Sequence, residues 1–506
     1  MKKLLKIIFG RLTIVTILIL SQVCLLIWGV FIAYRGYRFM PIITTIINIF
    51  LLIDLINRDM IADLKMPWIA IITIVPIAGP IIYMLFSRNL ARKSSIRFYD
   101  SVLLETQQTI SDLEVESNQL GDVAGQSNYI KNTSGCGLFQ NTQTIYFDSG
   151  EHFFKEYVED IKKAQSFIFM EYFILQRGVM LDTVLEILES KVKEGVEVRI
   201  IYDDIGTIGK LPSNFDKLLK KKGINCIKFN RFLPFVTAIH NNRDHRKITI
   251  IDGKIGYVGG INFADEYINV VERFGYWKDA SVKLVGDATR QLTVMFLQNF
   301  DLQAKLKEPY QKYTQIDREP VKAKGFVQPF CDGPSPVYPD LIGENVYLNL
   351  INQAKKTIMV STPYLIIDSQ MKNAMISAAK RNVRILIFTP HIPDKKSVFA
   401  LTRSSYVDLI KHGVEIYEYE PGFIHTKNIL VDDELAVVGT INLDYRSLVH
   451  HYECGIWMYQ TDCIQDIKND FDNILKHSIY IDPKHFKLNR REKILSMILK
   501  IFSPMM

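Results

Sequence analysis

The chain has 506 residues, 48% of them hydrophobic and 23% charged, a length for about three domains and a composition that excludes a disordered chain or a histone-like nucleic-acid binder. Six cysteines without a Cys-x-x-Cys pair exclude a disulfide scaffold, argue against a structural zinc site and favour a reducing compartment. The net charge of +7 suits an anionic partner, either a membrane surface or a phosphate-rich substrate.

Residues 1–100 carry the apolar excess and are predicted to form a transmembrane anchor. Residues 12–34 and 66–86 contain no charged side chain, and each is long enough to cross about 30 Å of hydrocarbon at roughly 1.5 Å per residue. A third segment, residues 40–56, includes Asp54 and is short for a span. Whether it crosses the membrane or lies in its interface is left open.

Basic residues on both sides of these segments predict the orientation. They are Lys2, Lys3, Lys6 and Arg11 before the first segment, and Arg88, Arg92, Lys93 and Arg97 after the last. With two spans both clusters lie on the same side, which the positive-inside rule makes cytoplasmic, whereas three spans leave the rule without a preference. We prefer two spans, and expect a multi-pass cell-membrane protein whose soluble part is cytoplasmic.

The soluble part repeats one pattern of elements. Periodicity predicts a strand at 166–174, a helix at 181–195 and strands at 197–203 and 224–230, then a strand at 354–366, a helix at 371–382 and strands at 383–390 and 414–420. The order is the same in both halves at a step of about 180 residues, which implies two copies of one α/β unit.

We therefore predict an α/β fold of two repeats packed as a bilobed domain, preceded by transmembrane helices. The expected parts are a linker at 101–144, a first lobe at 145–304, a proline-rich connection at 305–339, a second lobe at 340–480 and a basic amphipathic C-terminal segment at 481–506. Residues 487–502 suit either a helix on an anionic membrane surface or a helix packed on the domain.

Each copy carries the same polar motif, H-x-K-x4-D followed by glycine and asparagine. Its members are His245, Lys247, Asp252, Gly259, Gly260 and Asn262 in the first copy and His425, Lys427, Asp432, Gly439, Thr440 and Asn442 in the second. Residues i and i+2 of a strand share a face, so each histidine is expected beside its lysine. An imidazole can attack or transfer a proton near neutral pH, a lysine can hold a phosphate oxygen, and the asparagine adds a neutral donor.

Two such motifs facing each other would surround one phosphodiester. One histidine could attack phosphorus while the other protonates the leaving oxygen, with the lysines carrying the negative charge. This chemistry requires no metal and no other cofactor, and none is predicted. One His-x-Lys triplet would be a chance occurrence, but two matching patterns at equivalent positions of a repeat indicate a catalytic pair.

The two motifs resemble the HKD motifs of the phospholipase D superfamily, and the wider sequence resembles its bacterial cardiolipin synthases. The stretches that carry the resemblance are PWIAIITIVPIAGPIIYMLF, MEYFI, NNRDHRKITIIDGKIGYVGGIN, GYWKDASVKLVG and GFIHTKNILVDDELAVVGTINLDYRS. It covers the chain from about Lys65 to the C-terminus, and it implies two phospholipase D-like lobes.

The resemblance implies a phosphatidyltransferase of the EC 2.7.8 class. It would move a phosphatidyl group from one phosphatidylglycerol to another, giving cardiolipin and glycerol through a phosphatidyl-histidine. A phospholipase D-type hydrolase, a nuclease or another transphosphatidylase of the superfamily is the alternative, and an anchored lipid-binding protein with an inactive site is a third hypothesis. The expected partners are phosphatidylglycerol and cardiolipin in an anionic membrane, without nucleic acid; an oligomer is left open.

The resemblance also implies residue roles. His245 would be the nucleophile, and His425 would give and then take the proton. Downstream acidic residues match Asp279 and Glu453, where a carboxylate could fix the tautomer of a histidine. Which carboxylate serves which histidine stays open. The alternative for both acidic residues is a surface ion pair without a catalytic role.

Three further expectations concern neighbouring positions. Asp252 and Asp432, although grouped with the catalytic motif residues, are expected to hold the motif loops. His450 and His451 stand where the family usually has an asparagine; adjacent histidines of a strand point to opposite faces and no third ligand is evident, so no metal site is predicted. Arg246 stands between His245 and Lys247 in the expected strand, so its side chain is expected to point to the opposite face.

Overall fold

The computed structural model describes residues 39–75, 77–87, 114–232, 241–315 and 321–505, with single residues and pairs between 13 and 36 and between 101 and 112. The chain divides into two compact units. The small unit comprises Met1–Ala91, Asn230–Asn242 and Met497–Met506, and the large unit comprises Arg92–Phe229 and Arg243–Ser496.

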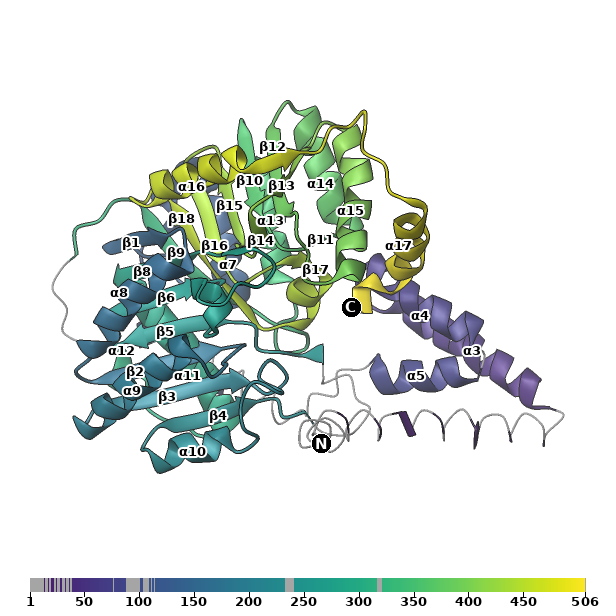
Figure 1. Ribbon diagram of the computed structural model, residues 1–506. Helices are drawn as coiled ribbons and strands as arrows, with labels where there is room; N and C mark the ends of the chain where they lie inside the picture. Colours follow the sequence, from purple (N-terminus) through teal and green to yellow (C-terminus); the bar gives the residue numbers. More distant parts are fainter. Residues whose placement is uncertain are drawn as a thin grey trace. The chain divides into compact units, whose positions relative to one another are not determined.

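The large unit contains two sheets built in the same order (Figure 1). The first has the strand order β1-β8-β6-β5-β2-β3-β4, and the second β9-β18-β16-β15-β10-β12-β13-β19. In the first sheet the neighbouring strands are antiparallel from β1 to β2 and parallel from β2 to β4. In the second sheet they are antiparallel from β9 to β10 and parallel from β10 to β13. The predicted α/β repeat is therefore confirmed, with β19 as an additional edge strand of the second copy.

The strand bounds are as follows. The first sheet has β1 (Thr142–Phe147), β2 (Phe167–Tyr172), β3 (Glu197–Asp203), β4 (Asn225–Phe229), β5 (Lys247–Ile251), β6 (Ile255–Gly259) and β8 (Ser281–Gly286). The second has β9 (Phe326–Asp332), β10 (Thr357–Ser361), β12 (Arg384–Pro390), β13 (Glu415–Tyr419), β15 (Asn428–Val431), β16 (Leu435–Gly439), β18 (Glu453–Tyr459) and β19 (Ser478–Tyr480). Two short pairs join β11 (Leu365–Ile366) to β17 (Leu443–Asp444) and β7 (Tyr276–Lys278) to β14 (Gly422–Ile424).

The helices follow the same duplication. The first copy has α8 (Gly150–Lys162), α9 (Val179–Lys193), α10 (Phe215–Lys221), η4 (Asp265–Ile268), α11 (Thr289–Ala304) and α12 (Gln311–Thr314). The second has α13 (Ile342–Gln353), α14 (Ser369–Lys380), α15 (Lys396–Lys411), η5 (Arg446–His450) and α16 (Ile464–Lys476). The helix predicted at 181–195 corresponds to α9, which buries Leu181, Val184, Leu185 and Leu188. Helix α11 is buried along nearly its whole length and contacts strands of both sheets.

Two predicted boundaries differ from the structure. The expected linker contains η2 (Ser117–Val123) and α7 (Ala124–Ser134), and α7 packs on α13 and β9 with Ile130 fully buried. The expected connection contains β9, which pairs with β18 along seven residues. Both segments complete the second copy, because an edge strand and a covering helix bury apolar surface that would otherwise face water.

The small unit contains α3 (Met40–Asn57), α4 (Ala62–Ile74) and α5 (Ala78–Phe86). Among the described residues, α3 is the helix that is long and apolar enough to cross a membrane. Residues 40–56, for which the sequence left a membrane crossing open, therefore belong to a continuous 18-residue helix. The predicted span at 12–34 lies largely outside the described residues.

The predicted single span at 66–86 is wrong, because the chain folds back between α4 and α5. Trp68 and Tyr83 would lie about 22 Å apart along one helix, yet their rings are 5.6 Å apart. Val75, which precedes Pro76, has a non-helical ψ of 78°, as the proline ring favours. The close approach also requires Gly79, where a Cβ would collide with the Ile71 carbonyl.

The motif aspartates hold loops, as expected, and do not lie beside the histidines. Asp252 accepts hydrogen bonds from the backbone N–H groups of residues 165, 166 and 167 at 2.7–2.8 Å. Asp432 does the same for residues 355, 356 and 357 at 2.6–2.8 Å. Each aspartate follows the end of its strand that is opposite the histidine. The grouping of Asp252 and Asp432 with the catalytic residues is therefore wrong.

We expect Asp432→Ala to lower the free energy of unfolding by about 1–3 kcal/mol, because three backbone donors lose their acceptor. Asp432 also has a positive φ of 53°, which asparagine tolerates better than alanine. Asp432→Asn should therefore lose less stability. Thermal unfolding in detergent measures both, and equal midpoints for the alanine variant and the unchanged protein would contradict the loop-holding role.

Candidate active site

The two motifs meet because each copy pairs its histidine segment with a strand of the other copy. The backbone N–H of His245 donates to the Tyr452 carbonyl at 2.9 Å, one residue before Glu453. The backbone N–H of His425 donates to the Lys278 carbonyl at 2.7 Å, one residue before Asp279. Parallel pairing of β14 with β7 extends the second contact.

This exchange gives each histidine a carboxylate from the opposite copy. Nδ1 of His245 donates to the Glu453 carboxylate at 2.9 and 3.1 Å, and Nδ1 of His425 donates to Oδ2 of Asp279 at 2.6 Å. Both carboxylates are fully buried, which rules out a surface ion pair. The assignment that the sequence left open is therefore crosswise.

Electrostatics fix the protonation state of both imidazoles. Burial, opposed by Glu453, lowers the pKa of His245 to about 4. Burial and the Lys427 charge lower the pKa of His425 to about 4, against the attraction of Asp279. Burial alone would raise the pKa of Glu453, but the charge and hydrogen bond of His245 outweigh it and lower it strongly. At neutral pH the Nδ1 proton of His245 faces a carboxylate, and its Nε2 carries the lone pair.

The two motif lysines are buried beside the histidines. Nζ of each lysine donates to the backbone carbonyl of the histidine two residues before it. Burial lowers the pKa of Lys247 to about 8 and that of Lys427 to about 7. An anion placed between them would restore both charges, so the site is suited to a phosphate group.

The two predicted asparagines have different environments. Asn262 accepts a hydrogen bond from the Ile174 backbone and donates to the Tyr267 hydroxyl at 2.7 Å, so its polar atoms hold neighbouring parts of the protein. Asn442 is also buried, and its Oδ1 has no hydrogen-bond partner among the described residues. Asn442 is therefore the better placed of the two to bind a ligand.

Some contributors were not assigned from the sequence. The Thr440 hydroxyl donates to Glu453, whereas Gly260 occupies the equivalent place because a Cβ there would collide with Asp279. Aromatic rings also line the histidines, with Phe173 at 5.1 Å from His245. Trp277, Tyr267 and Phe423 lie 5.2, 5.6 and 5.8 Å from His425. The Gly/Thr difference between the motifs was the available signal for Thr440.

His451 lies in the site, contrary to the strand geometry expected for the histidine pair, because η5 ends at His450. Ligand atoms of His245, His451 and Glu453 lie within 4.8 Å of one another, so three potential metal-ligating groups meet at a place where the sequence indicated none. However, Glu453 already accepts from His245 and Thr440, and two buried lysines share the site. This charge distribution fits an anion better than a metal cation.

Arg246 points away from the motif pair, as predicted. It forms a buried ion pair with Glu171 at 2.7 Å and a second with Asp244 at 3.1 Å, and Asn299 donates to both carboxylates. These residues form a structural network behind the site.

The lowered histidine pKa values predict acid destabilisation. An imidazole whose folded pKa is about 4 and whose unfolded pKa is about 6.5 binds more protons when unfolded between these values. Stability is therefore full above pH 6.5 and should fall as the pH drops toward 4. Thermal unfolding from pH 7.5 to 4.5 measures this slope, which should flatten in the His245→Gln/His425→Gln variant; an unchanged slope would contradict neutral buried histidines.

Comparisons with known proteins place this geometry in a family. The model described as "Cardiolipin synthase, PLD-like domain" matches residues 157–273 and 347–475, and "Phospholipase_D-nuclease N-terminal" matches 46–88. An uncharacterized protein of Streptococcus mutans is 45% identical over 379 residues, 75% of this chain and 82% of its own length. A cardiolipin synthase of Geobacillus kaustophilus is 32% identical over 471 residues, 91% of this chain and 92% of its own.

A solved structure agrees with the fold. Phosphatidylserine synthase of Haemophilus influenzae superposes with a TM-score of 0.57 at 14% identity, covering 75% of this chain and 97% of that one. At this identity the likeness shows the fold alone. The sequence relatives are more specific, and the chain belongs to the cardiolipin synthase family of phospholipase D-like proteins.

Proposed function

We propose that the protein is a cardiolipin synthase that transfers a phosphatidyl group from one phosphatidylglycerol to the glycerol hydroxyl of a second. The observation that carries the proposal is the crosswise pair of buried histidine–carboxylate dyads with two buried lysines. Family membership selects this reaction from the chemistry that such a site can perform.

In the first step, Nε2 of His245 attacks phosphorus and the bond from phosphorus to the glycerol headgroup breaks. Glu453 holds the Nδ1 proton of His245 and stabilises the positive charge that develops on the ring. Protonated His425 gives its Nε2 proton to the departing glycerol oxygen. Because the anionic substrate offsets Lys427, which depresses the pKa of His425, substrate binding raises that pKa and favours the protonated acid.

In the second step, neutral His425 takes the proton of the acceptor hydroxyl. The acceptor oxygen attacks phosphorus, the phosphorus–nitrogen bond breaks, and His245 is regenerated. One phosphodiester is exchanged for another, so no nucleotide is required. Water competes with the acceptor, and the deep burial of both histidines limits that side reaction to phosphatidic acid.

We propose multi-pass attachment to the cell membrane with the two lobes on the cytoplasmic side. Helix α3 supplies one span, and the uncharged stretch 12–34 is the other predicted span. Lys2, Lys3 and Lys6 then lie on the same side as the lobes, as the positive-inside rule favours. Protease treatment of sealed vesicles of known orientation tests this side. The C-terminus should be cleaved when the cytoplasmic face is outside and protected when it is inside.

A product assay tests the function. Purified protein with phosphatidylglycerol in mixed micelles, with EDTA and without nucleotide, should give cardiolipin and glycerol in equal amounts. His245→Ala should abolish both products, because phosphorus loses its nucleophile. Phosphatidic acid with glycerol, but without cardiolipin, would instead identify a hydrolase, and no product from the unchanged protein would contradict the assigned donor.

Covalent trapping tests the division of roles. A brief reaction stopped by alkaline denaturation should leave a phosphatidyl group on the peptide that contains His245, detected by mass spectrometry. The His245→Ala variant should carry no such group, and His425→Gln should form it at least tenfold more slowly because the leaving oxygen is not protonated. A modified His425 in the unchanged protein would reverse the roles.

A further inference from the structure

Helix α17 (Arg490–Phe502) exposes the wrong side for a helix in water. Ile494, Met497, Ile498 and Ile501 follow the spacing i, i+3, i+4, i+7 and form one stripe, the α17 stripe. Their exposed fractions are 62, 62, 55 and 42%. A surface helix of a soluble domain normally buries such a stripe, so this one indicates an apolar partner.

Two polar residues of the same helix, Glu492 and Ser496, face the protein instead. Ser496 is buried and its hydroxyl donates to the Lys493 carbonyl. Glu492 accepts from Arg403 of α15 at 2.9 Å. Glu492 and Asn489 also exchange hydrogen bonds at 2.8 and 3.0 Å, a capping box that fixes where the helix begins.

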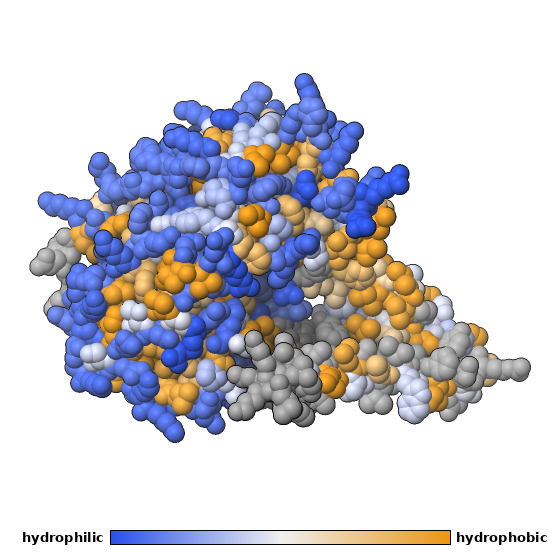
Figure 2. All heavy atoms as spheres, viewed as in Figure 1, coloured by the Kyte–Doolittle hydropathy of each residue, from blue (hydrophilic) through white to orange (hydrophobic). Residues whose placement is uncertain are grey.

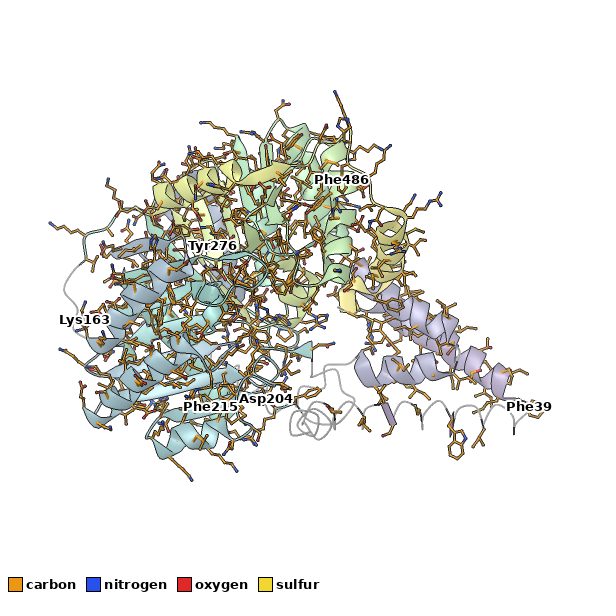
Figure 3. All side chains as sticks on the ribbon, viewed as in Figure 1. Phe39, Lys163, Asp204, Phe215, Tyr276 and Phe486 are labelled. Atoms are coloured by element: carbon orange, nitrogen blue, oxygen red, sulfur yellow. The ribbon has the colours of Figure 1, made fainter. Side chains whose placement is uncertain are left out.

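The chain before α17 is anchored as well. Phe486, beside α15 in Figure 3, packs on the Tyr406 ring at 5.5 Å and under Arg403 at 5.1 Å. These contacts fix the rotation of α17 about its axis. The outward direction of the α17 stripe is therefore imposed by specific contacts and is not an accident of a loose terminus.

The other end of α17 is tied to the apolar helices of the small unit. Residues 503–505 form a 3-10 turn that contacts α4, and Met505 packs on the cluster of Leu55, Trp68 and Tyr83. This cluster includes a residue of α3, the candidate membrane span. The C-terminal half of the stripe thus belongs to the unit that carries the membrane segment.

The charges beside the stripe identify the kind of apolar partner. The exposed basic residues are Lys487, Arg490, Arg491, Lys493 and Lys500. Against them stands a single acidic residue, Glu492, which is already paired with Arg403. Figure 2 shows orange apolar and deep blue polar side chains together on the visible face of α17. Basic flanks beside an apolar stripe match the headgroups and acyl boundary of an anionic bilayer.

We propose that α17 lies in the interface of an anionic membrane, with the α17 stripe inserted and the basic residues at the headgroups. The inference goes beyond the proposed reaction and does not depend on it. In combination with α3 it gives the chain a second membrane attachment.

Depth-dependent quenching tests the proposal in the full-length protein. A fluorophore is attached at Ile498→Cys in a Cys24→Ser background, because the other five cysteines are buried. The protein is placed in nanodiscs of phosphatidylglycerol and phosphatidylcholine. Brominated acyl chains should quench this probe at least threefold more than a probe at Val179→Cys in α9, which is equally exposed, and aqueous iodide should show the reverse order.

Either of two results would overturn the proposal. Equal quenching of both probes by iodide would place the α17 stripe in water, and shielding of Ile498→Cys from both quenchers would mean that a protein segment covers it. Nanodiscs of phosphatidylcholine alone should reduce the lipid quenching by at least twofold. Unchanged quenching there would refute the preference for anionic lipid.

A charged variant measures the consequence for turnover. Met497→Glu/Ile498→Glu should lower the rate with bilayer phosphatidylglycerol several-fold and leave the rate with a monomeric short-chain phosphatidylglycerol unchanged. Equal loss on both substrates would indicate a folding defect and contradict the interfacial role. Should the unchanged protein show no transfer activity, the proposed function fails, and the quenching experiment still decides the interfacial helix.

Discussion

The site depends on two short strand pairings exchanged between the copies. In each pairing, the backbone N–H of a motif histidine donates to the carbonyl of the residue that precedes the other copy's carboxylate. A hydrogen bond of 2.7–2.9 Å at the histidine backbone leaves the imidazole little freedom relative to its carboxylate. Neither copy can hold a complete histidine–carboxylate pair alone, so the duplication is a requirement of the chemistry and not only of the fold.

The same exchange explains the electrostatics. Bringing the two copies together buries two lysines, two histidines and two carboxylates in one place, and burial disfavours each charge. The imidazoles respond by staying neutral and the lysines by a lowered pKa. A bound phosphodiester adds negative charge beside the lysines and so favours their charged form. The lowered lysine pKa values therefore favour an anion, which is the class of ligand that the reaction requires.

Much of this was predictable from sequence, because the informative patterns are local. The repeat, the succession of strand, helix and strand from β2 to β3 and the two motifs follow from periodicity and residue spacing. The crosswise assignment was not predictable, since Glu453 and Asp279 each follow the motif of their own copy in sequence and reach the other one only through tertiary pairing. The fold-back between α4 and α5 was missed for a related reason. Hydropathy counts apolar residues, but the break depends on the pre-proline conformation of Val75 and on the close approach at Gly79.

The two dyads are equivalent in fold but not in surroundings, and the difference bears on their roles. Glu453 is fixed by His245 and Thr440 and flanked by His451 at 3.6 Å. Asp279 has Gly260 where the other copy has the threonine, and besides the His425 ring it accepts from the backbone N–H of the next residue. A nucleophile benefits from a carboxylate that never moves, because its attacking lone pair must keep one direction. An acid that later becomes a base must exchange its proton with two different oxygens, and a carboxylate with fewer side-chain hydrogen bonds permits that adjustment. The asymmetry thus supports His245 as the nucleophile and His425 as the proton carrier on grounds independent of motif order.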